Sequence, residues 1–224
     1  MNTSSASTTL TDFKLAIYRV VLSAGFLLFL SGVLAIPSYY ETTTLWYKTG
    51  VDKIMLIGGH YLGLLGFILL YLQIIISARG HFLDQVFGPA QLLRLHRLNG
   101  LLLLLIAASH ILLVLIPEGL ANLPLGKKFW PELVGAALFV CIVLLAGSSH
   151  FRQKINLPYN VWKSFHRPAG YLALLLVTVH VLFVSESFEQ TIPRIFVLGL
   201  FTLTVLWTVS VKARAGRKMR NSSK

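Results

Sequence analysis

Six long apolar runs constrain how this chain can fold. They cover residues 20–36, 54–78, 96–116, 130–147, 166–184 and 195–211. Each is close to the length of about twenty residues that a helix needs to cross the hydrocarbon core of a bilayer. A hydrophobic fraction of 55%, with only 12% charged residues, is far from that of an average soluble domain. We therefore expect an all-α membrane protein, a bundle of six transmembrane helices.

The distribution of basic residues predicts the orientation of these runs. Lysine and arginine concentrate in segments 14–19, 79–97 and 152–167 and in the tail after residue 211, whereas most acidic residues lie in the other connections. The positive-inside rule then places both termini in the cytoplasm. A net charge of +12 could otherwise indicate nucleic acid. Because the basic residues lie in short segments between apolar runs, they are better explained by topology, and we expect the lipid bilayer, not nucleic acid, as a partner.

Three parts of the chain follow from this pattern. Residues 1–13 form a polar segment rich in Ser and Thr that we expect to be disordered or interfacial. Residues 14–211 form the six-helix domain, and residues 212–224 form a basic cytoplasmic tail. The run at 20–36 could also be a signal peptide, but it is longer than a usual signal core and lacks a clear A-x-A pattern. Part of segment 79–97 could lie along the membrane surface as a short amphipathic helix.

One eighteen-residue pattern occurs twice, at 96–113 and at 166–183. In both copies a His-Arg pair is followed by Gly at the fifth position and by a second His at the fifteenth. On an α-helix, fourteen residues turn through about 1400°, roughly 40° short of four turns, and rise about 21 Å. Both histidines of one copy therefore lie on nearly the same face at two depths. The histidines of the two copies are His96 and His110, and His166 and His180.

Four matched histidines in apolar helices favour cofactor binding. A polar side chain in such a run is costly unless it has a partner or a function. A hydrogen bond to a neighbouring helix is the simpler explanation for one histidine, but it accounts poorly for four. We expect the two helices to face each other and to hold two flat metal cofactors, one between His96 and His166 and one between His110 and His180. Neutral imidazole is a good axial ligand for haem iron, and a bis-histidine haem has no open position for substrate, so it passes electrons.

Residues beside the histidines could assist such cofactors. Gly100 and Gly170 each follow the first His by four residues, on the same helix face, where a missing side chain would let a flat macrocycle approach the backbone. Close packing of membrane helices explains these glycines equally well. Arg97 and Arg167 could neutralise haem propionates or could extend to lipid phosphates. The single cysteine, Cys141, excludes an internal disulfide and a cysteine-based metal cluster.

Two stretches carry a resemblance to a known family. LDQVFGPAQLLRLHRLNG, followed by His110, and LPYNVWKSFHRPAGY, followed by His180, resemble the ferric reductase-like transmembrane domain of ferric reductases and NADPH oxidases. The resemblance extends from the second to the sixth run. It implies a six-helix domain that binds two b-type haems through the four histidines and moves electrons outward. In the family, the electrons come from NAD(P)H through FAD on a cytoplasmic domain that follows the sixth helix.

The chain departs from this family pattern in two ways. It ends just after the sixth run, so we expect either a separate cytoplasmic flavoprotein reductase that supplies FAD and NAD(P)H, or a sequence that is the membrane portion of a longer protein. His60 lies in GGHYLGLLGF, where related proteins often carry Arg. It could meet the propionates of the haem between His110 and His180 or could be a core histidine with an ordinary partner. His81 and His150 are expected near the cytoplasmic boundary, at the surface or near propionates.

The favoured function is that of a two-haem electron conduit in a bacterial inner membrane. A ferric or cupric chelate, oxygen, a quinone or a periplasmic redox protein could each receive the electrons, and no catalytic residue is indicated. A haem-binding subunit that feeds a periplasmic methionine sulfoxide reductase is a second interpretation. A haem-free transporter or assembly factor with protonatable histidines is a third.

Overall fold

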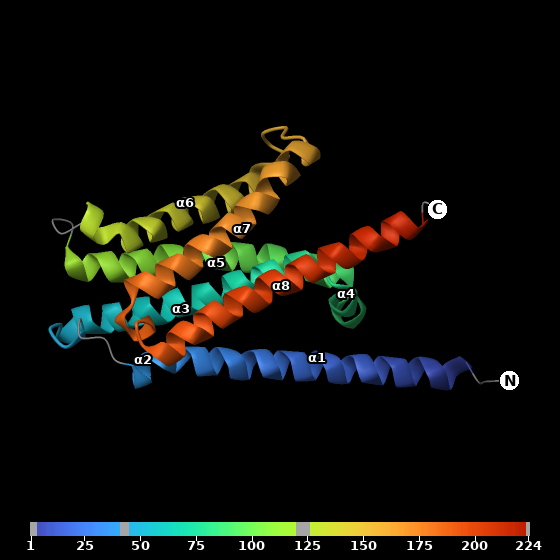
Figure 1. The fold of residues 1–224 in the computed structure, drawn as a ribbon, viewed down its shortest axis with the longest axis horizontal. Coiled ribbons are helices and arrows are strands. Elements are labelled where there is room, and N and C mark those ends of the chain that lie inside the picture. Colours follow the sequence, from blue (N-terminus) through green and yellow to red (C-terminus); the bar gives the residue numbers. More distant parts are fainter. Residues whose placement is uncertain (1–3, 41–44, 120–125, 223–224) are drawn as a thin grey trace.

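A computed structural model describes residues 4–40, 45–119 and 126–222 of the chain, and these residues form helices without any β-strand. Six helices in this part of the chain are long and apolar enough to cross a membrane, which confirms the predicted fold of an all-α, multi-pass integral membrane protein (Figure 1). The six are α1 (Ser4–Leu34), α3 (Gly50–Ala78), α5 (Pro89–Glu118), α6 (Trp130–Phe151), α7 (Tyr159–Val184) and α8 (Thr191–Ser222).

Short helices complete the connections between the spans. They are α2 (Ile36–Tyr39), α4 (His81–Phe87), and the 3-10 turns η3 (Lys127–Phe129) and η4 (Glu186–Phe188). Within residues 79–97 a separate short helix covers only α4, because Gly88 has a φ of +80° and separates it from α5; its expected position along the membrane surface stays a prediction. A φ in this range favours glycine, which has no Cβ to clash with its own backbone.

The helices that carry the repeated pattern begin earlier than the sequence predicted. α5 begins at Pro89 and α7 at Tyr159, so His96 and His166 each lie seven residues after the first residue of their helix. Proline is favoured in the first turn, where its missing N–H has no helical partner. The two copies of the pattern therefore occupy equivalent positions in two helices of similar length.

Both ends of the chain extend beyond the predicted spans. α1 begins at Ser4, so the polar segment expected to be disordered or interfacial is helical from Ser4 onward. α8 continues to Ser222, well past the expected end of the sixth span at residue 211. In Figure 1 the two termini lie at the same end of the bundle, and α1 runs along its edge. There Arg19 donates a hydrogen bond from Nε to the carbonyl oxygen of Val86, on α4, at 2.6 Å.

The core of the bundle lies around α3. Its residues Phe67, Ile68 and Tyr71 are almost fully buried, and α3 packs against α5, α7, α8 and α1. The Tyr71 hydroxyl lies 2.6 Å from Thr178 Oγ1 on α7. Thr178 Oγ1 in turn donates to the carbonyl oxygen of Leu174, so the tyrosine must be the donor of the first bond. This buried chain of hydrogen bonds links α3 to α7 in the apolar interior, where an unpaired hydroxyl would be costly.

The two histidine-bearing helices do not pack closely against each other. α5 packs mainly on α3, and α7 mainly on α6, whereas α5 and α7 are not a close-packed pair in the described part of the chain. Their backbones are therefore far enough apart for side chains to occupy the space between them. The fold arranges α3, α5, α6 and α7 so that the histidine faces of α5 and α7 meet through their imidazole rings.

Candidate functional site

The structure brings the four repeated histidines together in two pairs. The ring centroids of His96 and His166 are 6.4 Å apart, and those of His110 and His180 are also 6.4 Å apart. The ring planes are inclined by 65° in the first pair and by 81° in the second. All four rings are partly buried. These are the two pairings that equal depth on neighbouring helices predicts.

The separation within each pair fits a metal ion between the rings. A metal-to-imidazole-nitrogen bond is about 2 Å long, and the ring centroid lies roughly 1.1 Å behind the nitrogen. Two imidazoles on opposite sides of one metal ion would therefore have centroids about 6.2 Å apart. In the described residues no three His, Cys, Asp or Glu side chains converge to hold a metal. A metal in either pair would need its remaining ligands from elsewhere, and a porphyrin provides four nitrogens.

Backbone carbonyl groups orient His110 and His180, which we call the outer pair because the predicted orientation places it away from the cytoplasm. His110 Nδ1 lies 2.8 Å from the carbonyl oxygen of Gly59 on α3, and His180 Nδ1 lies 2.8 Å from that of Pro131 on α6. A carbonyl oxygen can only accept, so Nδ1 carries the proton in both rings and Nε2 keeps its lone pair. This is the tautomer that metal-binding histidines commonly adopt, with the second nitrogen donating to an oxygen.

Two glycines give the outer rings their space. A Cβ added to Gly63 would lie 2.9 Å from His110 Cε1, and one added to Gly135 would lie 2.5 Å from His180 Cε1. Each glycine follows the carbonyl residue by four positions, since Gly63 follows Gly59 and Gly135 follows Pro131. Residues four apart lie on the same helix face. The same arrangement, a carbonyl acceptor followed one turn later by a glycine, thus supports one outer histidine from α3 and the other from α6.

Side chains, not the backbone, surround His166 on α7, a member of the other pair, His96 and His166, which we call the inner pair. His166 Nδ1 lies 3.4 Å from Ser149 Oγ, and Ser149 Oγ donates its only proton to the carbonyl oxygen of Leu145 at 2.7 Å. The serine oxygen can therefore only accept from His166. The ring of Trp162 lies against that of His166, with centroids 4.4 Å apart and planes inclined by 32°. The guanidinium of Arg152 lies 5.8 Å from the Trp162 ring centroid, within the range of a cation–π contact.

An amide network borders the other inner histidine, on α5. Gln73 Nε2 donates to the carbonyl oxygen of His96 at 2.9 Å and lies 3.4 Å from His96 Nε2. Asn99 Nδ2 donates to Gln73 Oε1 at 2.8 Å and to the carbonyl oxygen of Leu69 at 2.9 Å. His96 Nδ1 is buried and has no hydrogen-bond partner. The inner pair therefore has weaker and less symmetric support than the outer pair.

Of the other predicted site residues, two glycines lie against α3 and two arginines are exposed. Cβ atoms on Gly100 and Gly170 would meet Gln73 Nε2 at 3.2 Å and Ile74 Cδ1 at 3.7 Å, so both glycines lie against α3. Their expected role in admitting a macrocycle stays a prediction. Arg97 and Arg167 are exposed, which is compatible with either of the contacts expected for them.

The remaining histidines occupy separate positions. His60 is partly buried on α3, next in sequence to Gly59. His81 is exposed at the first residue of α4, and His150 is exposed in the last turn of α6. The ring of His150 lies against that of Phe151, with centroids 4.8 Å apart. Neither His81 nor His150 belongs to a histidine pair among the described residues.

The acceptors and glycines that hold the outer rings were not among the residues predicted from the sequence. Gly59, Gly63, Pro131 and Gly135 lie on helices without the repeated pattern. Their shared spacing of four residues was visible, in GGHYLG and in PELVG. Without knowledge of which helix faces lie against α5 and α7, however, this spacing is common to many membrane helices.

Comparisons with known proteins give one match. A family model described as the ferric reductase like transmembrane component matches residues 62–177, which are 116 of the 224 residues. The matched region contains His96, His110 and His166, whereas His180 lies three residues beyond it. No curated protein and no solved structure matches the chain.

Proposed function

Because the chain belongs to the ferric reductase-like transmembrane family, we propose that it carries electrons across the membrane through two b-type haems. His96 and His166 would hold one haem, and His110 and His180 the other. The family supports transmembrane electron transfer and an oxidoreductase type of activity. The assignment of two haems to the four histidines rests on the residues of this chain.

The observation that carries the proposal is the matched geometry of the two pairs. Two imidazole pairs with the same separation of 6.4 Å are not needed for packing, and polar rings are costly inside apolar helices. In the outer pair both Nδ1 atoms lie at hydrogen-bonding distance from carbonyl oxygens, which leaves both Nε2 atoms available as ligands. Iron held by two imidazoles supplies reversible one-electron chemistry and has no open position for substrate.

The chain's own residues would orient and tune these groups. The carbonyls of Gly59 and Pro131 keep the outer Nδ1 protons in place, and such outer contacts raise the basicity of a ligating histidine. The buried residues of α3 keep water away from the bundle interior. Low dielectric and neighbouring charges then set the potentials at which the groups exchange electrons.

The proposed direction of transfer is from the cytoplasm outward. The positive-inside rule places the basic connections and both termini in the cytoplasm, so His96 and His166 would lie on the inner side. We propose a cytoplasmic flavoprotein as the donor, with FAD and NAD(P)H bound by that partner. An extracytoplasmic acceptor such as a ferric chelate or a periplasmic redox protein would receive the electrons. A bacterial inner membrane is the proposed location.

The absorption spectrum of the purified protein tests the proposal. We expect a Soret band, a haem-to-chain ratio of two, and two midpoint potentials in a redox titration. His180→Ala should remove one haem and one potential, and His166→Ala should remove the other. His150→Ala is the matched control, because His150 is exposed and lies outside both pairs, and it should keep both haems. A protein without a Soret band, or a His180→Ala variant with full haem content, would contradict the proposal.

A further inference from the structure

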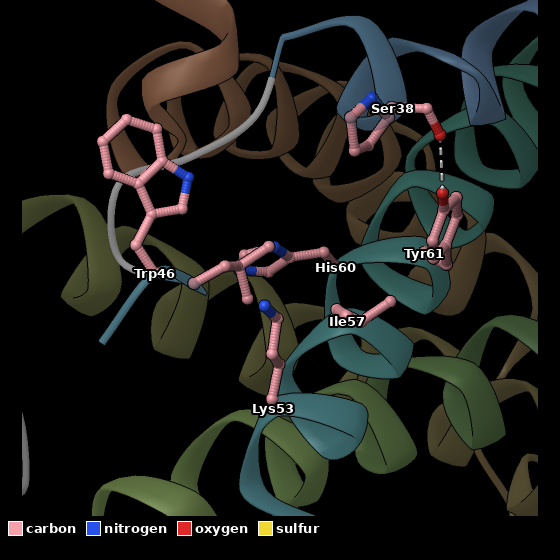
Figure 2. Close-up of a pocket in the computed structure, with 8 residues that line it drawn as sticks. Ser38, Trp46, Lys53, Ile57, His60 and Tyr61 are labelled. Carbon is pink, nitrogen blue, oxygen red and sulfur yellow. Dashed lines mark hydrogen bonds between the residues drawn. The ribbon is translucent and has the colours of Figure 1, made fainter. Parts of the chain in front are cut away.

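A pocket lies at the end of α3 that is nearer to the outer histidine pair. Its volume is about 250 Å³. Figure 2 shows residues that line it from α2, from the segment before α3, and from α3 itself. The lining residues are Pro37, Ser38, Leu45, Trp46, Lys53, Ile57, His60 and Tyr61.

The pocket combines a flat apolar surface with hydrogen-bond donors. Trp46, Leu45 and Ile57 supply the apolar part, and Lys53 and His60 converge on the same space (Figure 2). An ammonium group can only donate hydrogen bonds. The Tyr61 hydroxyl is paired with Ser38 Oγ at 3.0 Å. A ligand that suits this lining is a flat ring whose oxygen atoms accept hydrogen bonds.

The charges around the pocket favour a neutral ligand. Asp52 is adjacent to Lys53 in the chain, and the carboxylate of Glu186 is close enough to His60 to interact with its charge. One ammonium with two carboxylates nearby does not concentrate a multiply charged anion. The volume of about 250 Å³ is also below the roughly 300–1,000 Å³ of sites for drug-sized ligands, so the pocket accepts a single substituted ring.

The position of the pocket connects it to the outer pair and to the bilayer. His60 lines the pocket and is adjacent in sequence to Gly59, whose carbonyl oxygen lies 2.8 Å from His110 Nδ1. The pocket lies beside the first turns of α3, where a span enters the membrane. Exposed aromatic side chains such as Trp46 and Tyr47 are typical of the headgroup depth of a bilayer.

From these observations we propose that this pocket binds the ring of a quinone, with Lys53 and His60 donating to its carbonyl oxygens and Trp46 lying against its face. The inference rests on the proposed function and adds a membrane-soluble electron acceptor to it. Reduction of a quinone to a quinol takes two electrons, which the proposed electron path supplies, and two protons, which water at the outer surface supplies. No covalent bond between the ring and the protein forms or breaks.

Photolabelling tests binding without reference to electron transfer. An azido derivative of a short-chain ubiquinone, irradiated with the protein in lipid nanodiscs, should label peptides that contain residues 37–61, and excess decylubiquinone should suppress the labelling. Trp46→Ala and Lys53→Gln should lower the labelling about tenfold. The matched controls are Tyr47→Ala and Lys127→Gln, which alter an exposed aromatic residue and an exposed lysine outside the pocket. Labelling elsewhere, or equal labelling of pocket and control variants, would overturn the inference.

A second measurement separates this inference from the proposed function. In dithionite-reduced protein, Trp46→Ala and Lys53→Gln should slow reoxidation by decylubiquinone about tenfold and leave reoxidation by ferric citrate unchanged. Equal slowing with both oxidants, or a wild-type protein that decylubiquinone does not reoxidise, would overturn the quinone site while its haem spectrum still supported the electron conduit. A wild-type protein without haem would instead contradict the proposed function, whereas pocket labelling would still decide whether the ring binds.

Discussion

Gly135→Ala is the sharpest perturbation of the outer pair, because it adds one methyl group directly against a proposed ligand. The new Cβ would lie 2.5 Å from His180 Cε1, 2.8 Å from Nδ1 and 3.1 Å from Nε2. Ordinary van der Waals contact begins near 3.4 Å, so the ring must retreat by about 0.9 Å (3.4 − 2.5) or the two helices must separate. Overpacking of this kind costs about 1–3 kcal/mol.

The displaced ring would fail as a metal ligand. Metal–ligand distances tolerate changes of about 0.2 Å, which is several times smaller than the required shift. The shift would also disturb the 2.8 Å hydrogen bond between His180 Nδ1 and the Pro131 carbonyl. Loss of such an outer contact typically lowers metal affinity or activity by about 10–100-fold. We therefore expect Gly135→Ala to lose the outer haem or to leave its iron with an open position.

Haem content and carbon monoxide binding measure this outcome. The purified variant should contain about one haem per chain, or should bind carbon monoxide after reduction when the wild type does not. Gly147→Ala is the control on the same helix, since a Cβ there meets no atom within 4 Å, and it should behave as the wild type. Gly63→Ala should have a smaller effect, because its closest contact of 2.9 Å with His110 requires a shift of about 0.5 Å. Full haem content without carbon monoxide binding in Gly135→Ala would refute the reasoning.

Three further predictions test other parts of the bundle. Thr178→Val should destabilise the protein by about 1 kcal/mol in thermal unfolding, because it leaves the hydroxyl of Tyr71 buried without its acceptor. Adding Tyr71→Phe should restore most of this stability, and a double variant no more stable than Thr178→Val would contradict the reasoning. Ser149→Ala should raise the midpoint potential of the haem proposed at His96 and His166 and leave the other unchanged, because His166 loses its acceptor and becomes a less basic ligand. Equal shifts of both potentials would refute a local effect. Low-spin EPR signals should differ between the sites, with the greater anisotropy in the outer pair, whose ring planes cross at 81° rather than 65°, and His180→Ala should remove that signal.

The spacing of the four histidines was sufficient to predict their pairing. Fourteen residues correspond to nearly four turns of any α-helix, so the relative depth of His96 and His110 does not depend on tertiary contacts. The same holds for His166 and His180, and equal depth then selects the partners. The apolar runs predicted the six spans for a similar reason, because the thickness of a bilayer fixes the required length.

The support for the histidines could not be predicted in the same way. Whether Gly100 faces a macrocycle or Gln73 depends on how far α5 is rotated against α3, and that rotation is determined by side chains on both helices. The carbonyls of Gly59 and Pro131 carry no sequence signal, because every residue has one. Gly63 and Gly135 are informative only once α3 and α6 are known to lie behind the two outer rings.

The contrast between main-chain and side-chain support has a consequence for how the two sites can change. No amino-acid replacement at position 59 or 131 deletes a carbonyl oxygen, so the acceptors of His110 and His180 cannot be removed by changing the residue that carries them. The hydroxyl that accepts from His166 belongs to Ser149 and disappears with a single codon change. A single replacement can therefore remove the acceptor of His166, whereas a replacement beside the outer pair, such as Gly135→Ala, can only displace the ring from an acceptor that remains.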